Sequence, residues 1–202
     1  MSHIRPISLK EGDKVCIIST ARKVSEEEIL PAAKVLQSWG LEVTFGQNLF
    51  SECHQFAGSD LQRFSDLQQA LDEPNFKAIF CARGGYGTPR IIDFVNWAGF
   101  AKSPKWVVGF SDVSVLLAAV QNMGVCALHA PMPLFFARPE YQPSVRALKA
   151  CLFGEKSLLQ APPHPFNKIG ATQGVMVGGN LSMIVNSIGT STQFDPLGKI
   201  LF

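Results

Sequence analysis

The sequence contains no long apolar run and no long run of basic residues. No window approaches the roughly 18–20 apolar residues that a membrane-spanning helix needs, and Met1–Pro6 include no apolar core of signal-peptide length. The 18 Lys and Arg residues nearly balance the 16 Asp and Glu residues, which gives a net charge of +2, and no run of Lys and Arg forms a basic stripe. These absences predict a cytoplasmic protein with small or neutral partners, which binds neither nucleic acid nor a membrane.

The chain also has few residues suited to disulfides or metal binding. Its five cysteines are odd in number and scattered, and Cys16, Cys81 and Cys126 lie in apolar, strand-like runs, as buried free thiols do in a reducing compartment. Cys126 and His129 lie close together, but no third or fourth metal ligand is near them in the sequence. We therefore predict no disulfide, no metal and no cofactor.

What the chain does have is an alternation of short β-branched apolar runs with amphipathic helical patterns. This alternation is typical of a parallel sheet covered by helices on both faces, a doubly wound α/β fold. The expected strands are residues 14–20, 41–45, 76–81, 105–108 and 125–128. Helices are expected after the capping boxes Ser25/Glu28 and Ser59/Gln62, after Thr88 as N-cap, and over residues 112–123.

Polar or glycine-rich turns follow four of the expected strands. In a parallel sheet, the turns after the carboxyl ends of the strands meet at one edge, where ligands bind. The turns are residues 19–21, 83–88, 109–112 and 129–131. Functional residues are therefore expected at this edge.

Ser111 lies at the most informative of these turns. An apolar run from Trp106 stops at Gly109, and Ser111 comes just before a helical pattern. A sharp strand-to-helix turn exposes a nucleophilic hydroxyl and places helix amides near a developing oxyanion. Ser and Asp are also ordinary helix caps, so Ser111 and Asp112 taken alone fit a capping role as well.

Three glycines lie among the five residues Arg83-Gly84-Gly85-Tyr86-Gly87. A phosphate-binding loop is disfavoured because neither known glycine-rich phosphate pattern is present. Two interpretations remain open. The loop is either a tight structural turn, or its amides supply half of an oxyanion hole, with Arg83 or Tyr86 available to hold a substrate carboxylate.

Together, these motifs resemble the LD-carboxypeptidase family of serine peptidases, which includes murein tetrapeptide carboxypeptidases and microcin C immunity peptidases. The motifs occur in order over nearly the whole chain: residues 83–87, 109–112, 129–131 and 178–182. The resemblance implies a flavodoxin-like N-terminal domain, here residues 1–153, and the start of a second, β-rich domain at 170–202. The proline-rich stretch 161–165 indicates a linker between them, over 154–169. The resemblance also implies a Ser-His-Glu triad with Ser111 as nucleophile, and backbone amides of Asp112 and of Gly84 or Gly85 as oxyanion donors.

The chain departs from the family in two places. Ala130 stands between His129 and Pro131, where the family more usually has glycine. The triad glutamate and histidine of the family lie beyond the position of Phe202, so we expect a fragment, or a shortened gene product, with little or no activity. His129 is the histidine nearest to the expected site. A general base must come within hydrogen-bond reach of the Ser111 hydroxyl. For His129 we favour a structural role, or one of supporting a residue of the site, over that of general base.

The function implied by the resemblance is hydrolysis of the amide bond between an L-centre and a C-terminal D-amino acid in murein tetrapeptides, through an acyl-enzyme, during cell-wall recycling. The expected partner is thus a small peptide substrate, and a homodimer is left open. Two alternatives remain: a hydrolase of peptidyl-nucleotide antibiotics of the microcin C type, and a non-catalytic module that binds a small ligand.

Overall fold

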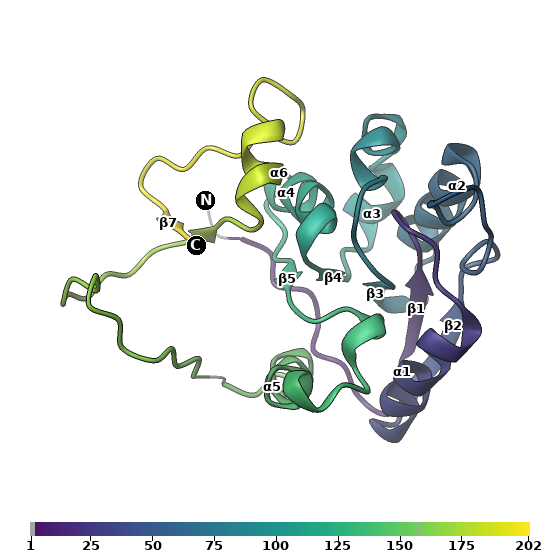
Figure 1. Ribbon diagram of the computed structural model, residues 1–202, viewed down its shortest axis with the longest axis horizontal. Coiled ribbons are helices and arrows are strands. Elements are labelled where there is room, and N and C mark those ends of the chain that lie inside the picture. Colours follow the sequence, from purple (N-terminus) through teal and green to yellow (C-terminus); the bar gives the residue numbers. More distant parts are fainter. Residues whose placement is uncertain (1–2, 157) are drawn as a thin grey trace.

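The computed structural model describes residues 3–156 and 158–202. Its centre is a parallel sheet of five strands in the order β2-β1-β3-β4-β5 (Figure 1). This strand order is that of flavodoxin-like folds, so the predicted fold class is confirmed. The strands are β1 (Lys14–Ile18), β2 (Glu42–Phe45), β3 (Phe76–Cys81), β4 (Trp106–Gly109) and β5 (Leu128–His129).

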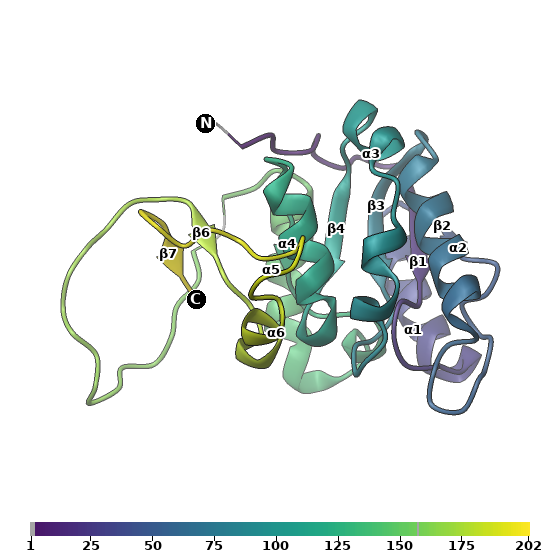
Figure 2. The same cartoon turned by 90° about the horizontal axis from the view of Figure 1, so that it is seen from above.

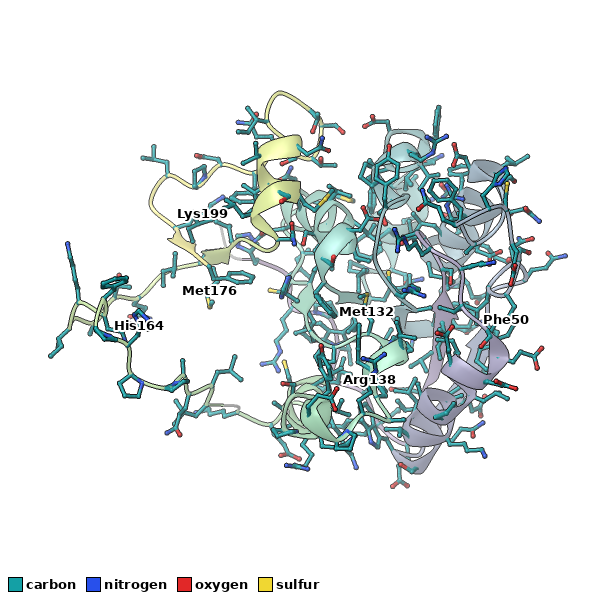
Figure 3. The ribbon with its side chains drawn as sticks, viewed as in Figure 1. Phe50, Met132, Arg138, His164, Met176 and Lys199 are labelled. Carbon is teal, nitrogen blue, oxygen red and sulfur yellow. The ribbon has the colours of Figure 1, made fainter. Side chains whose placement is uncertain are left out.

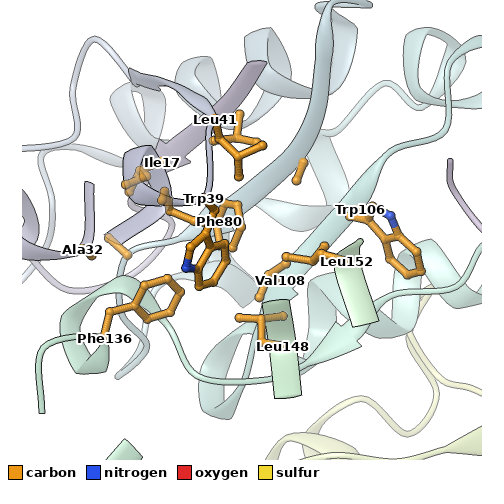
Figure 4. Close-up of a cluster of buried hydrophobic side chains, with 14 of the residues drawn as sticks. Ile17, Ala32, Trp39, Leu41, Phe80, Trp106, Val108, Phe136, Leu148 and Leu152 are labelled. Carbon is orange, nitrogen blue, oxygen red and sulfur yellow. The ribbon is translucent and has the colours of Figure 1, made fainter. Parts of the chain in front are cut away.

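Helices cover both faces of the sheet. On one face lie α1 (Glu26–Ser38) and α5 (Gln142–Leu152), and on the other lie α2 (Asp60–Asp72), α3 (Ala98–Lys102) and α4 (Ser114–Asn122) (Figures 1 and 2). Each face encloses a separate apolar core, and Figure 4 shows the one on the α1 and α5 side, with Trp39, Phe80 and Phe136 at its centre. Because the central strands are buried from both sides, they are almost entirely apolar.

Several predicted elements are confirmed. Ser25 and Ser59 form the capping boxes that begin α1 and α2. The region around Thr88 is different: it forms a 3₁₀ turn over Thr88–Arg90, and Gly87, not Thr88, holds the N-cap position. The side-chain hydroxyl of Thr88 bonds to Thr20 Oγ1 and does not cap the turn, and the N–H of Thr88 is bound by Asp112, far along the chain.

Strand positions also shift slightly. β4 ends at Gly109, because Gly109 pairs with His129. Lys105 does not belong to β4, and its Nζ donates hydrogen bonds to the carbonyls of Leu71 and Glu73 at the end of α2. Val125 pairs with Ile4 of the N-terminal segment, so β5 begins only at Leu128. Helices α3 and α5 were not predicted.

Residues 158–175 follow an extended path away from the five-stranded sheet (Figure 1). The chain then forms β6 (Met176–Val177), α6 (Leu181–Asn186) and β7 (Ile200–Leu201), and β6 pairs with β7 in parallel. Figure 3 shows His164 far from the sheet, and Met176 and Lys199 near the paired strands. Val177 and Phe194 pack on Ala118 of α4, which holds this segment against the edge of the α/β unit.

Among the described residues, no helix combines the length and the apolar character that crossing a membrane requires.

Candidate active site

Ser111 lies on a sharp turn between β4 and α4. Its φ of +62° is one of two positive values at described residues other than glycine, and this backbone conformation is costly for an L-residue. The turn is tight: a Cβ added to Gly109 would lie 2.6 Å from Cγ1 of Val113. A 3₁₀ turn over Ser111–Val113 leads into α4, and no side-chain cap bonds are present at the start of either helix. The capping interpretation of Ser111 and Asp112 therefore does not describe the structure.

The glycine loop after β3 packs directly on this turn. A Cβ added to Gly84 would lie 3.1 Å from Cβ of Ser111, 3.3 Å from its Oγ and 3.4 Å from the backbone nitrogen of Asp112. Gly85 and Gly87 have φ values of +122° and +153°, which favour glycine. The loop thus brings its backbone within contact distance of both the hydroxyl and the first amide after it. An oxyanion site needs backbone donors close to the nucleophile, and this approach is compatible with that requirement.

A buried carboxylate ties the two turns together. Oδ2 of Asp112 accepts a 2.9 Å hydrogen bond from the backbone N–H of Thr88, and Thr88 Oγ1 shares a 2.8 Å hydrogen bond with Thr20 Oγ1. Asp112 is 1% exposed, and its Oδ1 has no hydrogen-bond partner among the described residues. Burial raises the pKa of this carboxyl, against the opposing effect of the bonds from Thr88.

A small pocket of about 160 Å³ opens beside Ser111. Arg83, Gly84, Gly85 and Ser111 line it together with residues that the sequence had not singled out, namely Arg22, Phe110, Met132, Leu134 and Phe135. Figure 3 labels Met132 on the segment that follows β5. The structure therefore brings four of the predicted site residues around one cavity.

Tyr86 is not among the residues that line this pocket. Its ring lies 6.1 Å from that of Phe56, and 45% of the residue is exposed. Arg63 and Arg90 place their guanidinium groups over the same Phe56 ring, and both pair with Asp60. Tyr86 therefore belongs to a neighbouring cluster that supports the glycine loop from the side.

His129 lies in β5, opposite Gly109. Its ring lies 6.0 Å from that of Phe110 and 5.4 Å from that of Phe202, and desolvation lowers the pKa of the imidazole. His129 lines two other cavities, but not the pocket that contains Ser111. No hydrogen bond found among the described residues joins it to Ser111.

The Gly178-Gly179-Asn180 motif reaches the same region from the far end of the chain. The N–H of Asn180 donates a 3.2 Å hydrogen bond to Oγ of Ser114, at the start of α4. Gly179 has a φ of +139°, and a Cβ there would lie 2.8 Å from Ser114 Oγ and 3.5 Å from Cδ2 of His129. Glycine is thus required for the motif to pack between Ser114 and His129.

The described residues hold no cluster of three or more His, Cys, Asp or Glu side chains that would suit a metal ion. All five cysteines are free. Burial raises the pKa values of the Cys16 and Cys81 thiols to about 12, so neither thiol is an activated nucleophile.

Besides the apolar residues of the pocket, two polar residues of this site were missed from the sequence. Arg22 follows the turn after β1, directly beyond the polar residues 19–21, and its position at the sheet edge was the available signal. Thr88 was assigned to a helix cap, and no local pattern indicated that its amide bonds to Asp112.

Comparison with known proteins gives a consistent result. Residues 15–130 match the family described as the LD-carboxypeptidase N-terminal domain. The chain is 32% identical to a probable murein peptide carboxypeptidase of Bacillus subtilis, over 98% of this chain and 64% of that protein. It is 30% identical to a murein tetrapeptide carboxypeptidase of Pseudomonas aeruginosa, over 93% of this chain and 64% of that protein.

Solved structures share the fold. A muramoyltetrapeptide carboxypeptidase from Oxalobacter formigenes superposes with a TM-score of 0.75 at 26% identity, over 90% of this chain and 62% of that one. An MccF-like protein from Bacillus anthracis superposes with a TM-score of 0.83 at 24% identity, over 98% of this chain and 69% of that one. The chain spans about 64% of the length of the two curated relatives named above.

Proposed function

This chain belongs to the LD-carboxypeptidase family, and on that basis we propose that it carries the serine nucleophile and the oxyanion site of a serine carboxypeptidase. The substrate class is a murein tetrapeptide, and the bond hydrolysed joins an L-centre to the C-terminal D-amino acid. In this proposal residues 1–153 form the nucleophile-bearing domain, 154–169 a linker, and 170–202 the start of a second domain.

One observation carries the proposal: Ser111 is held at a φ of +62° with Gly84 packed against both its hydroxyl and the Asp112 amide. A strained backbone is maintained only where the surroundings enforce it. Here they enforce the exposure of a hydroxyl beside two stretches of backbone that can donate N–H groups to an oxyanion.

The reaction in this proposal is acyl transfer. Oγ of Ser111 attacks the carbonyl carbon of the scissile amide, and the resulting oxyanion accepts hydrogen bonds from the Asp112 amide and from Gly84 or Gly85. The general base, which has taken the Ser111 hydroxyl proton during the attack, gives this proton to the amide nitrogen as the C–N bond breaks, and the D-amino acid leaves. Water attacks the acyl-enzyme, which releases the shortened peptide and restores the Ser111 hydroxyl.

The names of the curated relatives support murein peptides as the substrate class. The relatives named as murein peptidases are 30% and 32% identical to this chain. The microcin C7 self-immunity protein captured with glutamyl sulfamoyl guanosine is 17% identical, a level at which the likeness concerns the fold alone. Murein peptides are therefore the substrates of choice for a first assay.

The 202 residues alone are expected to turn over substrate slowly or not at all. The general base must come within hydrogen-bond reach of Ser111, and His129 lines other cavities and packs on Phe110 and Phe202. In this proposal the family's histidine and glutamate supply the base from residues other than those described.

The test is release of the terminal D-alanine from the tetrapeptide L-alanyl-D-glutamyl-meso-diaminopimelyl-D-alanine. The product of the complete reading frame should release D-alanine, and the 202-residue chain should release little. Rapid turnover by the 202-residue chain would overturn the assignment of the base, and Ser111-independent turnover would overturn the proposed nucleophile.

A further inference from the structure

Two arginines, from the loops that follow two neighbouring strands, line the pocket that contains Ser111. Arg22 follows β1 and Arg83 follows β3, and these two strands lie side by side in the sheet. After β1 the chain passes to α1 on one face, and after β3 it passes to the face covered by α3 (Figure 1). The two arginines thus flank the point where the winding of the sheet reverses, which is the usual ligand-binding place in such folds.

The Arg22 side chain is held in place along its length. A Cβ added to Gly85 would lie 2.6 Å from Cδ of Arg22 and 2.7 Å from its Cγ, so the stem lies on the glycine loop. Its Nη2 donates a 3.3 Å hydrogen bond to Oε1 of Gln55, and its backbone pairs with Phe56. Gly85 therefore has a second role, because any side chain at that position would displace Arg22.

The guanidinium groups of Arg22 and Arg83 both have N–H donors available to a ligand. Nη1 of Arg83 donates to the carbonyl of Lys23 at 3.3 Å, and Arg22 makes its one side-chain bond to Gln55. Each guanidinium has five N–H donors. Most of these donors are thus free of protein hydrogen bonds among the described residues.

The charge in the pocket has one sign. Its lining includes two arginines and no acidic side chain, and its other wall is apolar, formed by Phe110, Met132, Leu134 and Phe135. Acidic side chains on the adjoining loop are already paired, Glu52 with Lys23 and Asp60 with Arg90. An anionic group attached to a small apolar group satisfies both walls, and a guanidinium matches the planar geometry of a carboxylate.

We infer that Arg22, together with Arg83, forms a subsite for the free carboxylate of the residue that leaves the substrate, and that Arg22 makes this chain selective for peptides with a free C-terminus. The inference rests on the proposed function, because it identifies the pocket beside Ser111 as the place where the leaving residue binds. Arg22 is a binding residue in this scheme and takes no part in proton transfer.

The experiment is a pair of NMR titrations of the 202-residue chain with N-acetyl-L-lysyl-D-alanine and with its C-terminal amide, followed at the amides of Gly84, Gly85 and Ser111. The acid should bind about tenfold or more tightly than the amide, because a charge-assisted pair is lost in the amide. Arg22→Gln should remove most of this preference. Lys34→Gln is the matched control: it deletes an exposed positive charge on α1, outside the pocket lining, and should preserve the preference.

Equal affinity for acid and amide, or no binding of either, overturns the subsite. A preference for the acid that survives Arg22→Gln overturns the role of Arg22. Failure of the proposed function gives a different result, in which the acid is preferred through Arg22 but D-alanine release from the tetrapeptide does not depend on Ser111.

Discussion

The backbone N–H of Thr88 donates a 2.9 Å hydrogen bond to the carboxylate of Asp112, and this hydrogen bond joins the glycine loop to the serine turn. Both residues are buried, with 0% and 1% of their surface exposed. Since the two proposed oxyanion donors lie on opposite sides of this contact, their separation depends on it.

Replacement of Asp112 tests this connection. Asp112→Ala leaves the Thr88 N–H buried without an acceptor, so it should lower the free energy of unfolding by about 1–3 kcal/mol. Asp112→Asn keeps an acceptor oxygen and should lose much less. Urea denaturation of the two variants provides the comparison, and equal losses would show that the hydrogen bond to Thr88 is not what stabilises the loop.

The same carboxyl predicts a pH dependence of stability. Burial raises the pKa of Asp112 above its ordinary value of 3.8. Between that value and the raised pKa, the folded protein holds a proton that the unfolded chain has lost, so this residue makes the protein less stable as the pH rises through the window.

Asp112→Asn cannot ionise and removes this contribution. The unfolding free energy of the variant, measured relative to the wild type, should therefore increase from about pH 4 upward and level off above the raised pKa. A difference between the two proteins that stays constant with pH would contradict a raised pKa at Asp112.

Because Ser111 has a positive φ, replacing it with glycine should have an unusual effect on the free energy of unfolding. At a φ of +62° a glycine avoids the steric cost of a side chain, about 1 kcal/mol or more, although it adds entropy to the unfolded chain. Ser111→Gly should therefore be at least as stable as Ser111→Ala.

Ser65 supplies the control, because it lies exposed within α2. There, glycine should be about 0.5–1 kcal/mol less stable than alanine. The comparison needs only thermal or urea unfolding of four variants. If glycine is destabilising relative to alanine by the same amount at both positions, Ser111 is not strained.

Replacement of Gly84 by alanine is predicted to lower the activity much more than the stability. In Gly84→Ala the new Cβ would lie 3.1 Å from Cβ of Ser111, so the loop and the turn must separate by a few tenths of an ångström. We expect a clear loss of D-alanine release by the complete gene product, with unfolding free energy changed by about 1 kcal/mol or less. Gly170→Ala, where an added Cβ meets nothing within 4 Å, should alter neither, and unchanged activity in Gly84→Ala would refute the close approach.

The sequence predicted those parts of the site that depend on neighbouring residues. The Ser111 turn follows from an apolar run that ends at Gly109, and the capping boxes of α1 and α2 lie within four-residue windows. The place of each turn at one sheet edge follows from the parallel arrangement alone.

The remaining features depend on contacts between distant segments. Val125 pairs with Ile4, and the Thr88 amide bonds to Asp112, so no local pattern revealed where β5 begins or why the helix expected at Thr88 is a 3₁₀ turn. Arg22 enters the pocket because β1 and β3 are adjacent. Its role depends on strand order, which the alternation of strands and helices does not specify.

The most direct test of the central claim, that Ser111 is the nucleophile, is the rate of D-alanine release from the murein tetrapeptide by the complete gene product and by its Ser111→Ala variant. Loss of a nucleophile typically lowers kcat by about 10⁶-fold. The exposed Ser65→Ala serves as control and should retain the full rate. The account predicts that activity disappears only with Ser111, and a Ser111→Ala protein that releases D-alanine at the wild-type rate would contradict it.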